Sequence, residues 1–282
     1  MYYCSNIQNV DIKVRLSQRY TFIEGNICDA DLVTKTLINH KITHVIHFAA
    51  QSHVQNSFSS SIQYTKDNVV GTHVLLESCR MYKKIKKFIH VSTDEVYGGD
   101  TMTTTIQTEK SILTPTNPYA ASKAAAEMIA LSYIKSFNLP IIITRGNNVY
   151  GKNQHSEKVI PNFINKLRNN ERVDIHGDGS CIRDFLHISD AISAFILILD
   201  KGVIGEIYNI GCNKTNKGHS ILELAQILIK KIKNTTDYAQ YINYVEDRPF
   251  NDKRYYIDNT KLKTLGWTIK VNFDDGINEL IY

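Results

Sequence analysis

The segment Lys87-Phe88-Ile89-His90-Val91-Ser92-Thr93-Asp94-Glu95-Val96-Tyr97-Gly98 begins as an apolar strand and ends in a hydroxyl and two adjacent carboxyls. Open α/β sheets bind their ligands outside the carboxyl ends of their strands. Two neighbouring carboxyls in one cleft rarely ionise together, so one tends to remain an acid while the other serves as a base. The segment therefore predicts an acid–base site at a sheet edge. The alternative is a helix-capping turn with solvated side chains.

Strands and helices alternate on both sides of this segment. Apolar runs predict strands at residues 20–23, 43–49, 87–92 and 139–144. Helical periodicity predicts helices at residues 30–38, where Asp29 is the expected N-cap, 62–81 and 119–137. This order predicts an α/β fold, a doubly wound parallel sheet covered by helices on both faces.

Shorter elements and more polar loops follow residue 150. We expect helices at residues 159–168, 189–199 and 221–232, and strands at 173–176 and 206–210. They predict a smaller mixed α/β substrate lobe that is interleaved with the end of the sheet. We therefore divide the chain into residues 1–150, a Rossmann-type domain, and residues 151–282, mainly a substrate-binding lobe.

The composition is that of an ordinary globular protein, with 43% hydrophobic and 22% charged residues. A net charge of +5 is mild, and its densest run, at residues 83–87, is more typical of a solvated face than of a nucleic-acid site. We see no apolar run of membrane-spanning length and no signal peptide. The five cysteines are scattered without a C-x-x-C spacing, which favours reduced thiols in the cytoplasm and no zinc site. His47 and His53 lack the paired spacing of metal ligands, so we expect no metal.

Tyr119 and Lys123 lie four residues apart in the predicted helix 119–137, and hence on one face of it. A neighbouring ammonium would lower the pKa of the phenol and make it a usable base near neutral pH. Such a pair is weak evidence when it stands alone, because a surface tyrosine beside a surface lysine is common. Its meaning depends on the carboxyl segment that precedes it.

Taken together, the ordered motifs resemble the nucleotide-sugar 4,6-dehydratases of the extended short-chain dehydrogenase/reductase superfamily. This family is typified by dTDP-glucose 4,6-dehydratase and by the UDP-glucose dehydratase part of rhamnose synthases. The resemblance covers about residues 3–267. Besides Tyr119 and Lys123, its specific pieces are HFAAQSHV (47–54), NVVGT (68–72), STDEVYG (92–98), NNVYG (147–151), EKVIP (157–161), YNIG (208–211) and DRPFND (247–252).

The resemblance implies a catalytic set and an ordered reaction. Tyr119, helped by Lys123 and Thr93, would take the proton of the sugar 4-hydroxyl while hydride leaves C4 for NAD. Glu95 would remove the C5 proton, and Asp94 would protonate the departing 6-hydroxyl. The hydride would return at C6, giving NDP-4-keto-6-deoxyglucose and water, a step in rhamnose-type deoxysugar biosynthesis.

The resemblance also implies binding residues and an assembly. The implied cofactor-binding positions are Asn26, Ile27, Phe48, Ala49, Ala50, Ser92, Tyr119 and Lys123. The implied substrate positions are Asn148, Glu157, Lys158, His176, Arg183, Asn209 and Arg248. Arg183 could instead pair with Asp184 or Asp178 in a surface turn, and His176 could be an ordinary loop histidine. A homodimer through the two long helices is implied as well.

One expected feature is absent from the sequence. A dinucleotide fold begins with a strand, a glycine-rich turn and a helix whose N-terminus receives the diphosphate, and the relatives carry such a turn at their start. Here about 30 residues of that unit are not found. Either the true start lies upstream of Met1 or the gene is a shortened remnant.

Three functions therefore remain open at this point. The first is a dTDP- or UDP-glucose 4,6-dehydratase, and the run at residues 248–252 favours the UDP type. The second is a 4-epimerase, which would share Tyr119 and Lys123 without needing Asp94 and Glu95. The third is an inactive sugar-nucleotide-binding protein.

Overall fold

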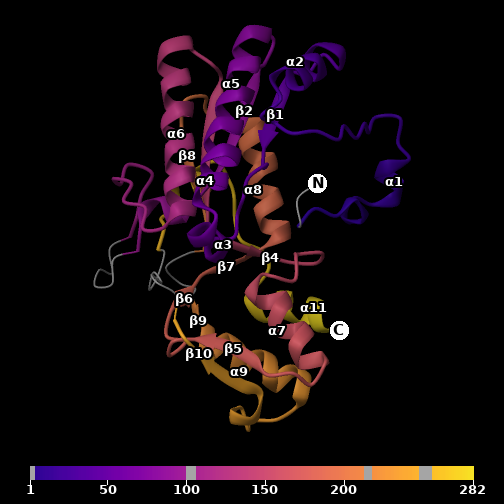
Figure 1. The fold of residues 1–282 in the computed structure, drawn as a ribbon, viewed down its shortest axis with the longest axis vertical. Coiled ribbons are helices and arrows are strands. Elements are labelled where there is room, and N and C mark those ends of the chain that lie inside the picture. Colours follow the sequence, from indigo (N-terminus) through magenta and orange to yellow (C-terminus); the bar gives the residue numbers. More distant parts are fainter. Residues whose placement is uncertain (1–3, 100–105, 213–217, 248–255) are drawn as a thin grey trace.

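The computed structural model describes residues 4–99, 106–212, 218–247 and 256–282. Its centre is a parallel sheet with the strand order β1 (His44–His47), β2 (Lys87–Thr93), β3 (Ile141–Gly146), β8 (Ile207–Ile210). Figure 1 shows this sheet in the upper half of the molecule, with a smaller lobe below it. The predicted parallel α/β architecture is confirmed.

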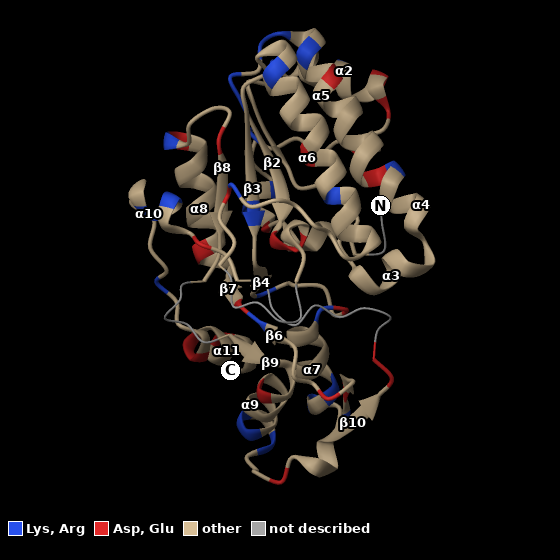
Figure 2. Ribbon diagram, turned by 90° about the vertical axis from the view of Figure 1, so that its left-hand side faces the viewer, with Lys and Arg blue, Asp and Glu red and all other residues tan. Residues whose placement is uncertain are grey.

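Helices cover both faces of the sheet, as Figure 2 shows. One face packs against α2 (Ala30–Asn39), α5 (Gly71–Tyr82) and α6 (Pro118–Phe137), and the other against α8 (Ile188–Lys201) and α10 (Thr260–Thr264). The alternation of the strands explains the two cores. In β3, Ile141 and Ile143 enter the α5–α6 core, whereas Ile142 enters the α8 core, and all three are fully buried.

The long helix expected at residues 62–81 is interrupted. It consists of α4 (Ser61–Tyr64), a π-helical turn at Thr65–Val70 and α5. Asn68 in that turn donates a hydrogen bond of 2.8 Å to the hydroxyl of Ser122 on α6. The extra residue of a π turn thus brings a polar side chain to the neighbouring helix.

The strand expected at residues 20–23 is not formed. Residues 21–26 have no regular structure, and Phe22 and Ile23 are exposed. A strand needs a neighbour to pair its backbone groups, and in the described part of the chain no strand lies outside β1. The prediction of a strand at residues 20–23 was therefore wrong. The local apolar pattern is typical of a strand, but the described residues provide no neighbouring strand for it to pair with. Two short helices lie elsewhere in this half, α1 (Ile12–Arg15) and α3 (Val54–Ser59).

The lower lobe has its own apolar core. It is built on α7 (Val159–Arg168), α9 (Ile221–Lys233), α11 (Phe273–Ile281) and the parallel pair β5 (Val173–His176) and β10 (Ile242–Val245). Short strand pairs join it to the sheet: β4 (Asn148–Tyr150) with β7 (Phe185–His187), and β6 (Ile182–Arg183) with β9 (His219–Ser220). A division of the chain at residue 150 remains our proposal. None of the helices that the structure describes is both long and apolar enough to cross a bilayer.

Candidate active site

The acid–base segment turns sharply where β2 ends. Thr93 caps the short 3-10 helix η3 (Asp94–Tyr97) by accepting a hydrogen bond of 3.3 Å from the backbone N–H of Glu95. Gly98 ends the turn with φ +71°, and a Cβ there would lie 2.1 Å from the carbonyl oxygen of Thr114. Only glycine fits this position, so the chain leaves the sheet edge in one fixed direction.

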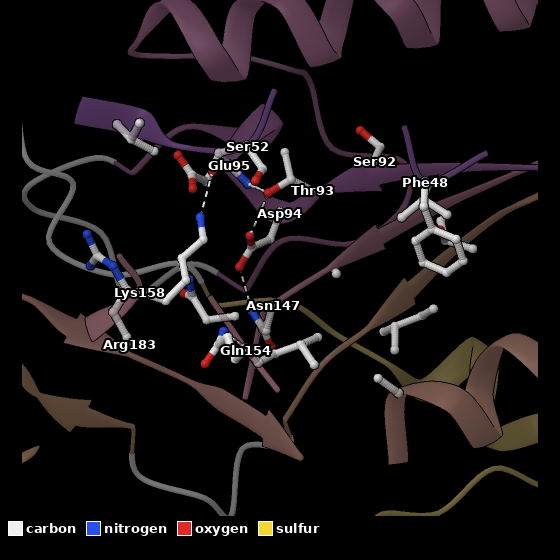
Figure 3. Close-up of a pocket in the computed structure, with 18 of the residues that line it drawn as sticks. Phe48, Ser52, Ser92, Thr93, Asp94, Glu95, Asn147, Gln154, Lys158 and Arg183 are labelled. Carbon is white, nitrogen blue, oxygen red and sulfur yellow. Dashed lines mark hydrogen bonds between the residues drawn. The ribbon is translucent and has the colours of Figure 1, made fainter. Parts of the chain in front are cut away.

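Asp94 and Glu95 open into a cavity of about 490 Å³ at the carboxyl edge of the sheet. In Figure 3, Phe48 and Ser92 lie toward one end of this cavity, Lys158 and Arg183 toward the other, and the Thr93–Asp94–Asn147 group between them. Further lining residues include Ser52, Glu95, Asn117, Tyr119, Asn148, Gln154 and Glu157. The structure therefore gathers most of the predicted site residues around one space.

Asp94 is held as a buried acid. It accepts a hydrogen bond of 2.6 Å from the side-chain amide of Asn147 and one of 3.2 Å from the hydroxyl of Thr93. Burial and then the neighbouring Glu95 raise its pKa to about 7, against the opposing effects of those two hydrogen bonds and of Arg183. A carboxyl with such a pKa can donate a proton near neutrality.

Glu95 points into the same cavity and is held by a different residue. The side-chain amide of Asn117 donates to it at 3.2 Å. Asn117 also caps α6, because the oxygen of its side-chain amide accepts a hydrogen bond of 2.9 Å from the backbone N–H of Ala120. Pro118 follows at the first helical position. One asparagine thus fixes both the second carboxyl and the start of the helix that carries Tyr119.

Tyr119 lines the cavity but is not the activated phenol that its spacing predicts. Burial, and then Glu95, raise its pKa far above the ordinary range, while the hydroxyl of Thr93 acts in the opposite direction. The expectation that Lys123 lowers this pKa is wrong for the structure as it stands. The ammonium of Lys123 donates instead to the backbone carbonyl of Val91, at 2.6 Å.

Lys123 is itself buried, and burial lowers its pKa to about 8 while Glu127 opposes the shift. Two buried histidines, His47 on β1 and His90 on β2, lie side by side with their ring centroids 5.5 Å apart. His47 hydrogen-bonds the hydroxyl of Thr72 at 2.9 Å, and burial lowers its pKa to about 3. His53 caps α3. In the described ranges, no group of three His, Cys, Asp or Glu side chains could hold a metal ion.

The far end of the cavity is cationic. Lys158 donates to the backbone carbonyl of Ser52 at 2.9 Å and lies 3.7 Å from the carboxylate of Glu157. Arg183 lines both this cavity and a second one of about 310 Å³, as do His53 and Glu157. His176 lines the second cavity and contacts the carbonyl of Glu246 at 3.0 Å. Arg183 therefore lies where the adjoining cavities meet, and Lys158 lines the first cavity near it.

The remaining implied residues lie elsewhere. Asn209 is fully buried, accepts from the phenol of Tyr97 at 2.7 Å and donates to the carbonyl of Asp258 at 3.0 Å, so it does not line the cavity. The side chain of Asn209, on β8, points into the protein interior. Five of the implied cofactor positions lie outside both cavity linings, namely Asn26, Ile27, Ala49, Ala50 and Lys123. Arg248 lies outside the described residues.

Sequence reasoning missed Asn147 and Asn117. Asn147 belongs to the Asn147-Asn148 pair, and the sequence does not tell which amide faces Asp94. Asn117 precedes a proline at the start of a helix, which predicts only a cap. Their contacts with Asp94 and Glu95 join residues far apart in the chain, so a local pattern could not reveal them.

Comparison with known proteins tests the resemblance directly. The GDP-mannose 4,6 dehydratase family matches residues 1–280. The chain belongs to this family. It is thus a nucleotide-sugar 4,6-dehydratase homologue of the extended short-chain dehydrogenase/reductase type, which confirms the family predicted from the motifs.

Individual relatives agree with the family. The human dTDP-D-glucose 4,6-dehydratase is 45% identical over 282 residues, which is 99% of this chain and 79% of the relative. A trifunctional UDP-glucose 4,6-dehydratase, 3,5-epimerase and reductase of Arabidopsis thaliana is 46% identical over 98% of this chain. The chain spans only 41% of the length of that relative.

A solved structure gives the same answer for the fold. The dTDP-glucose 4,6-dehydratase of Streptomyces venezuelae, solved with NAD and TYD bound, superposes with a TM-score of 0.89. It is 35% identical, and the match covers 95% of this chain and 80% of that one. This likeness confirms the Rossmann-type α/β fold.

Proposed function

We propose that the chain dehydrates an NDP-glucose to NDP-4-keto-6-deoxyglucose and water, using NAD as a returning hydride carrier. The observation that carries this proposal is the pair Asp94 and Glu95, each held by its own asparagine in the cavity that Tyr119 lines. A 4-epimerase moves a hydride at one carbon and needs no second acid and base. Elimination of water across C5 and C6 needs both.

The reactive end of NAD fits the end of the cavity that contains Phe48 and Ser92. The hydroxyl of Ser92 is buried, and within the described ranges it has no hydrogen-bond partner. A buried hydroxyl of this kind suits a polar group of a ligand. When bound, the cofactor accepts hydride from C4 and returns it at C6, and its oxidised ring is a cation that favours ionised neighbours. Ala49 and Ala50, at the end of β1, remain our proposed contacts for its diphosphate and ribose.

Tyr119 would take the proton of the sugar 4-hydroxyl as C4 is oxidised. For this the phenol must be ionised, and two features of the chain support that state. The hydroxyl of Thr93 acts to lower the pKa of the phenol, and Lys123 lies one helical turn away with a pKa of about 8. We propose that the ammonium leaves the carbonyl of Val91 when the site is filled.

The two carboxyls would then divide the elimination between them. A ketone at C4 makes the C5 proton acidic, and Glu95 removes it. Asp94, whose pKa of about 7 leaves it protonated in a large share of molecules near neutral pH, protonates the 6-hydroxyl as it departs. After hydride arrives at C6, Glu95 gives its proton back to C5.

Lys158 and Arg183 would hold the diphosphate of the substrate, and Asn148 and Glu157 the sugar side. Both cations lie at the cationic end of the cavity, and a guanidinium binds a diphosphate through paired donors. His176 would lie near the nucleotide base, because it lines the adjoining cavity. Of dTDP and UDP we propose UDP, which the run at residues 248–252 favours.

Incubation of the purified chain with UDP-glucose or dTDP-glucose and NAD tests the proposal. We expect a 4-keto product, detected by its alkaline absorbance, from the chain and not from Asp94→Asn. Formation of a UDP-galactose product would identify a 4-epimerase instead. Neither product, together with no binding of NAD by calorimetry, would identify a binding protein.

We also propose that the enzyme is a cytoplasmic homodimer. The helices α5 and α6 lie side by side in Figure 1 and expose Met81, Met128 and Phe137. Apolar side chains on two adjacent helices suit a helix-to-helix interface with a second copy. Met128→Lys should convert a dimer into a monomer in light scattering; a chain that is monomeric before substitution would refute this part.

A further inference from the structure

Four buried polar side chains form one hydrogen-bonded cluster: Tyr97, Glu127, Arg145 and Asn209. They belong to η3, α6, β3 and β8 respectively, and each is at most 2% exposed. None of the four lines either of the two cavities described above. The cluster therefore affects the proposed reaction only through the elements that it holds in place.

Arg145 is the centre of this cluster. Its Nη2 and Nε atoms donate to Oε2 of Glu127 at 2.7 and 3.0 Å, and its Nη1 atom donates to the phenol oxygen of Tyr97 at 2.9 Å. Glu127 lies on α6, the helix that carries Tyr119, whereas Tyr97 ends the turn η3, which carries both carboxyls of the cavity. One guanidinium thus joins the two elements that carry the proposed catalytic groups.

The phenol of Tyr97 is held from two sides. It accepts from Arg145 and donates to the side-chain oxygen of Asn209 at 2.7 Å. Asn209 is itself fixed, because its side-chain amide donates to the carbonyl of Asp258 at 3.0 Å and its backbone N–H donates to the carboxylate of Glu109 at 3.0 Å. Burial raises the pKa of Tyr97 to about 12, so the phenol stays protonated near neutral pH and remains a donor.

The backbone of η3 is held separately by Thr114. Its N–H donates to the carbonyl of Val96 at 3.1 Å, and its hydroxyl donates to that of Tyr97 at 2.6 Å. Loss of the Tyr97 hydroxyl should therefore leave the turn formed but less firmly oriented. In a turn of four residues, a small rotation at Tyr97 moves Asp94 and Glu95 with it.

We propose that Tyr97 is a positioning residue for the elimination step, an inference that presupposes the function proposed above. Its hydroxyl joins η3 to Arg145 and so holds Asp94 and Glu95 in a fixed place relative to Tyr119 on α6. Tyr97 gives and takes no proton in the reaction. Misplacement of catalytic groups by about 1 Å can slow a reaction by about a hundredfold, so a residue outside the cavity can still limit the rate.

Tyr97→Phe tests the proposal, with Tyr208→Phe as the matched control. Both side chains are buried, and each substitution removes only a hydroxyl that has a hydrogen-bond partner. The hydroxyl of Tyr208 accepts from the backbone N–H of Val203 at 3.1 Å, in the loop that precedes β8 and not in the cluster. Both variants should therefore unfold at a lower urea concentration than the parent.

Stopped-flow kinetics with NAD and UDP-glucose distinguish the two variants. We expect Tyr97→Phe to slow elimination by about ten- to a hundredfold. Oxidation at C4 and the KM for UDP-glucose should change little, because the pair of Arg145 and Glu127 still holds α6. Reduced cofactor should then accumulate as near-ultraviolet absorbance. Tyr208→Phe should keep the parent kcat and accumulate no reduced cofactor, although it is also less stable.

Three outcomes contradict the proposal. An unchanged kcat in Tyr97→Phe would show that the hydroxyl does not position the carboxyls. Equal slowing of oxidation and elimination in that variant would assign the effect to a general loosening of the fold. The same accumulation of reduced cofactor in Tyr208→Phe would mean that lost stability alone explains it.

Hydrogen exchange tests the same contact without turnover. The N–H of Gly98 donates to the carbonyl of Glu95 at 3.1 Å across η3. It should exchange about tenfold faster in Tyr97→Phe than in the parent or in Tyr208→Phe. An unchanged rate would mean that the hydroxyl does not hold the turn. If the parent forms no 4-keto product, the proposed function fails, whereas the exchange rates still decide whether Tyr97 holds η3.

Discussion

The side-chain amide of Asn147 donates a hydrogen bond of 2.6 Å to Asp94, and the carbonyl oxygen of the same amide accepts from the backbone N–H of Cys212 at 3.0 Å. Gly211 makes room for it, since a Cβ at that position would lie 2.1 Å from the amide oxygen. The ends of β3 and β8 thus fix the orientation of the acid at the end of β2. Residues just beyond two other strands thus moderate the acidity of Asp94, whose pKa is raised by burial and Glu95.

Replacement of Asn147 by alanine should shift the pH profile of the reaction. In the proposed reaction Asp94 acts in its protonated form, so activity should fall as pH rises through its pKa of about 7. Loss of the amide removes a hydrogen bond that stabilises the carboxylate of Asp94, and this raises the pKa of Asp94 by about one unit. The falling limb of kcat against pH should therefore move to higher pH.

Asn165→Ala is the matched control for that shift, because Asn165 is exposed on α7. Its pH profile should coincide with that of the unsubstituted chain. A falling limb that stays in place in Asn147→Ala would mean that Asp94 is not the group that titrates.

Asp94 should make the fold less stable at high pH. Its pKa in the folded chain is about 7, against 3.8 for an ordinary aspartate, so the folded state binds the proton more tightly than the unfolded state. The contribution of Asp94 to the free energy of unfolding is most favourable below about pH 4 and is lost as pH rises through about 7. Asp94→Asn should then be more stable than its parent at about pH 8, by up to about 4 kcal/mol, and much less so at about pH 5.

Urea unfolding at the two pH values measures this difference. Asp200→Asn, at an exposed position, should change the free energy of unfolding little at either pH. An equal gain for Asp94→Asn at both pH values would contradict the assignment.

The buried ion pair of Arg145 and Glu127 should matter far more to stability than a surface pair. Arg145 on β3 contacts Glu127 on α6 at 2.7 Å, and the two side chains are 3% and 0% exposed. Glu127→Gln leaves the buried guanidinium without its counter-charge, which costs about 3–5 kcal/mol. Chemical denaturation should show a loss of this size, and α6, which carries Tyr119, should become less firmly held.

Glu206→Gln is the comparison, because the pair of Glu206 and Lys261 is half-exposed. It should cost about 0–1 kcal/mol. Equal losses for the two variants would show that burial does not decide the strength of these pairs.

Replacement of Glu95 by glutamine should separate oxidation from elimination. In the proposed reaction Glu95 is the base that removes the C5 proton, so product formation should fall by about 10²–10⁴-fold. Proton NMR in deuterated water should show no exchange at C5, while oxidation at C4 still appears as near-ultraviolet absorbance of the reduced cofactor. Glu171→Gln, at an exposed position, should behave as the parent. Exchange at C5 at the parent rate would assign the base to another residue.

The sequence alone determined the parallel sheet, the long helix α6 and the segment that bears Thr93, Asp94 and Glu95. These features depend on local periodicity and on the order of elements along the chain, both of which a single sequence contains. It also placed Tyr119 and Lys123 on one helix. The family followed from the same ordered motifs.

Only the tertiary structure decided which polar groups meet. It left residues 20–23 without a partner strand, turned Asn209 into the interior, and chose Asn147 as the donor to Asp94. It also set the proton affinities, raising the pKa of Asp94 and directing Lys123 to a backbone carbonyl. Strand pairing, burial and hydrogen-bond choice depend on residues distant in the chain, and no local pattern records them.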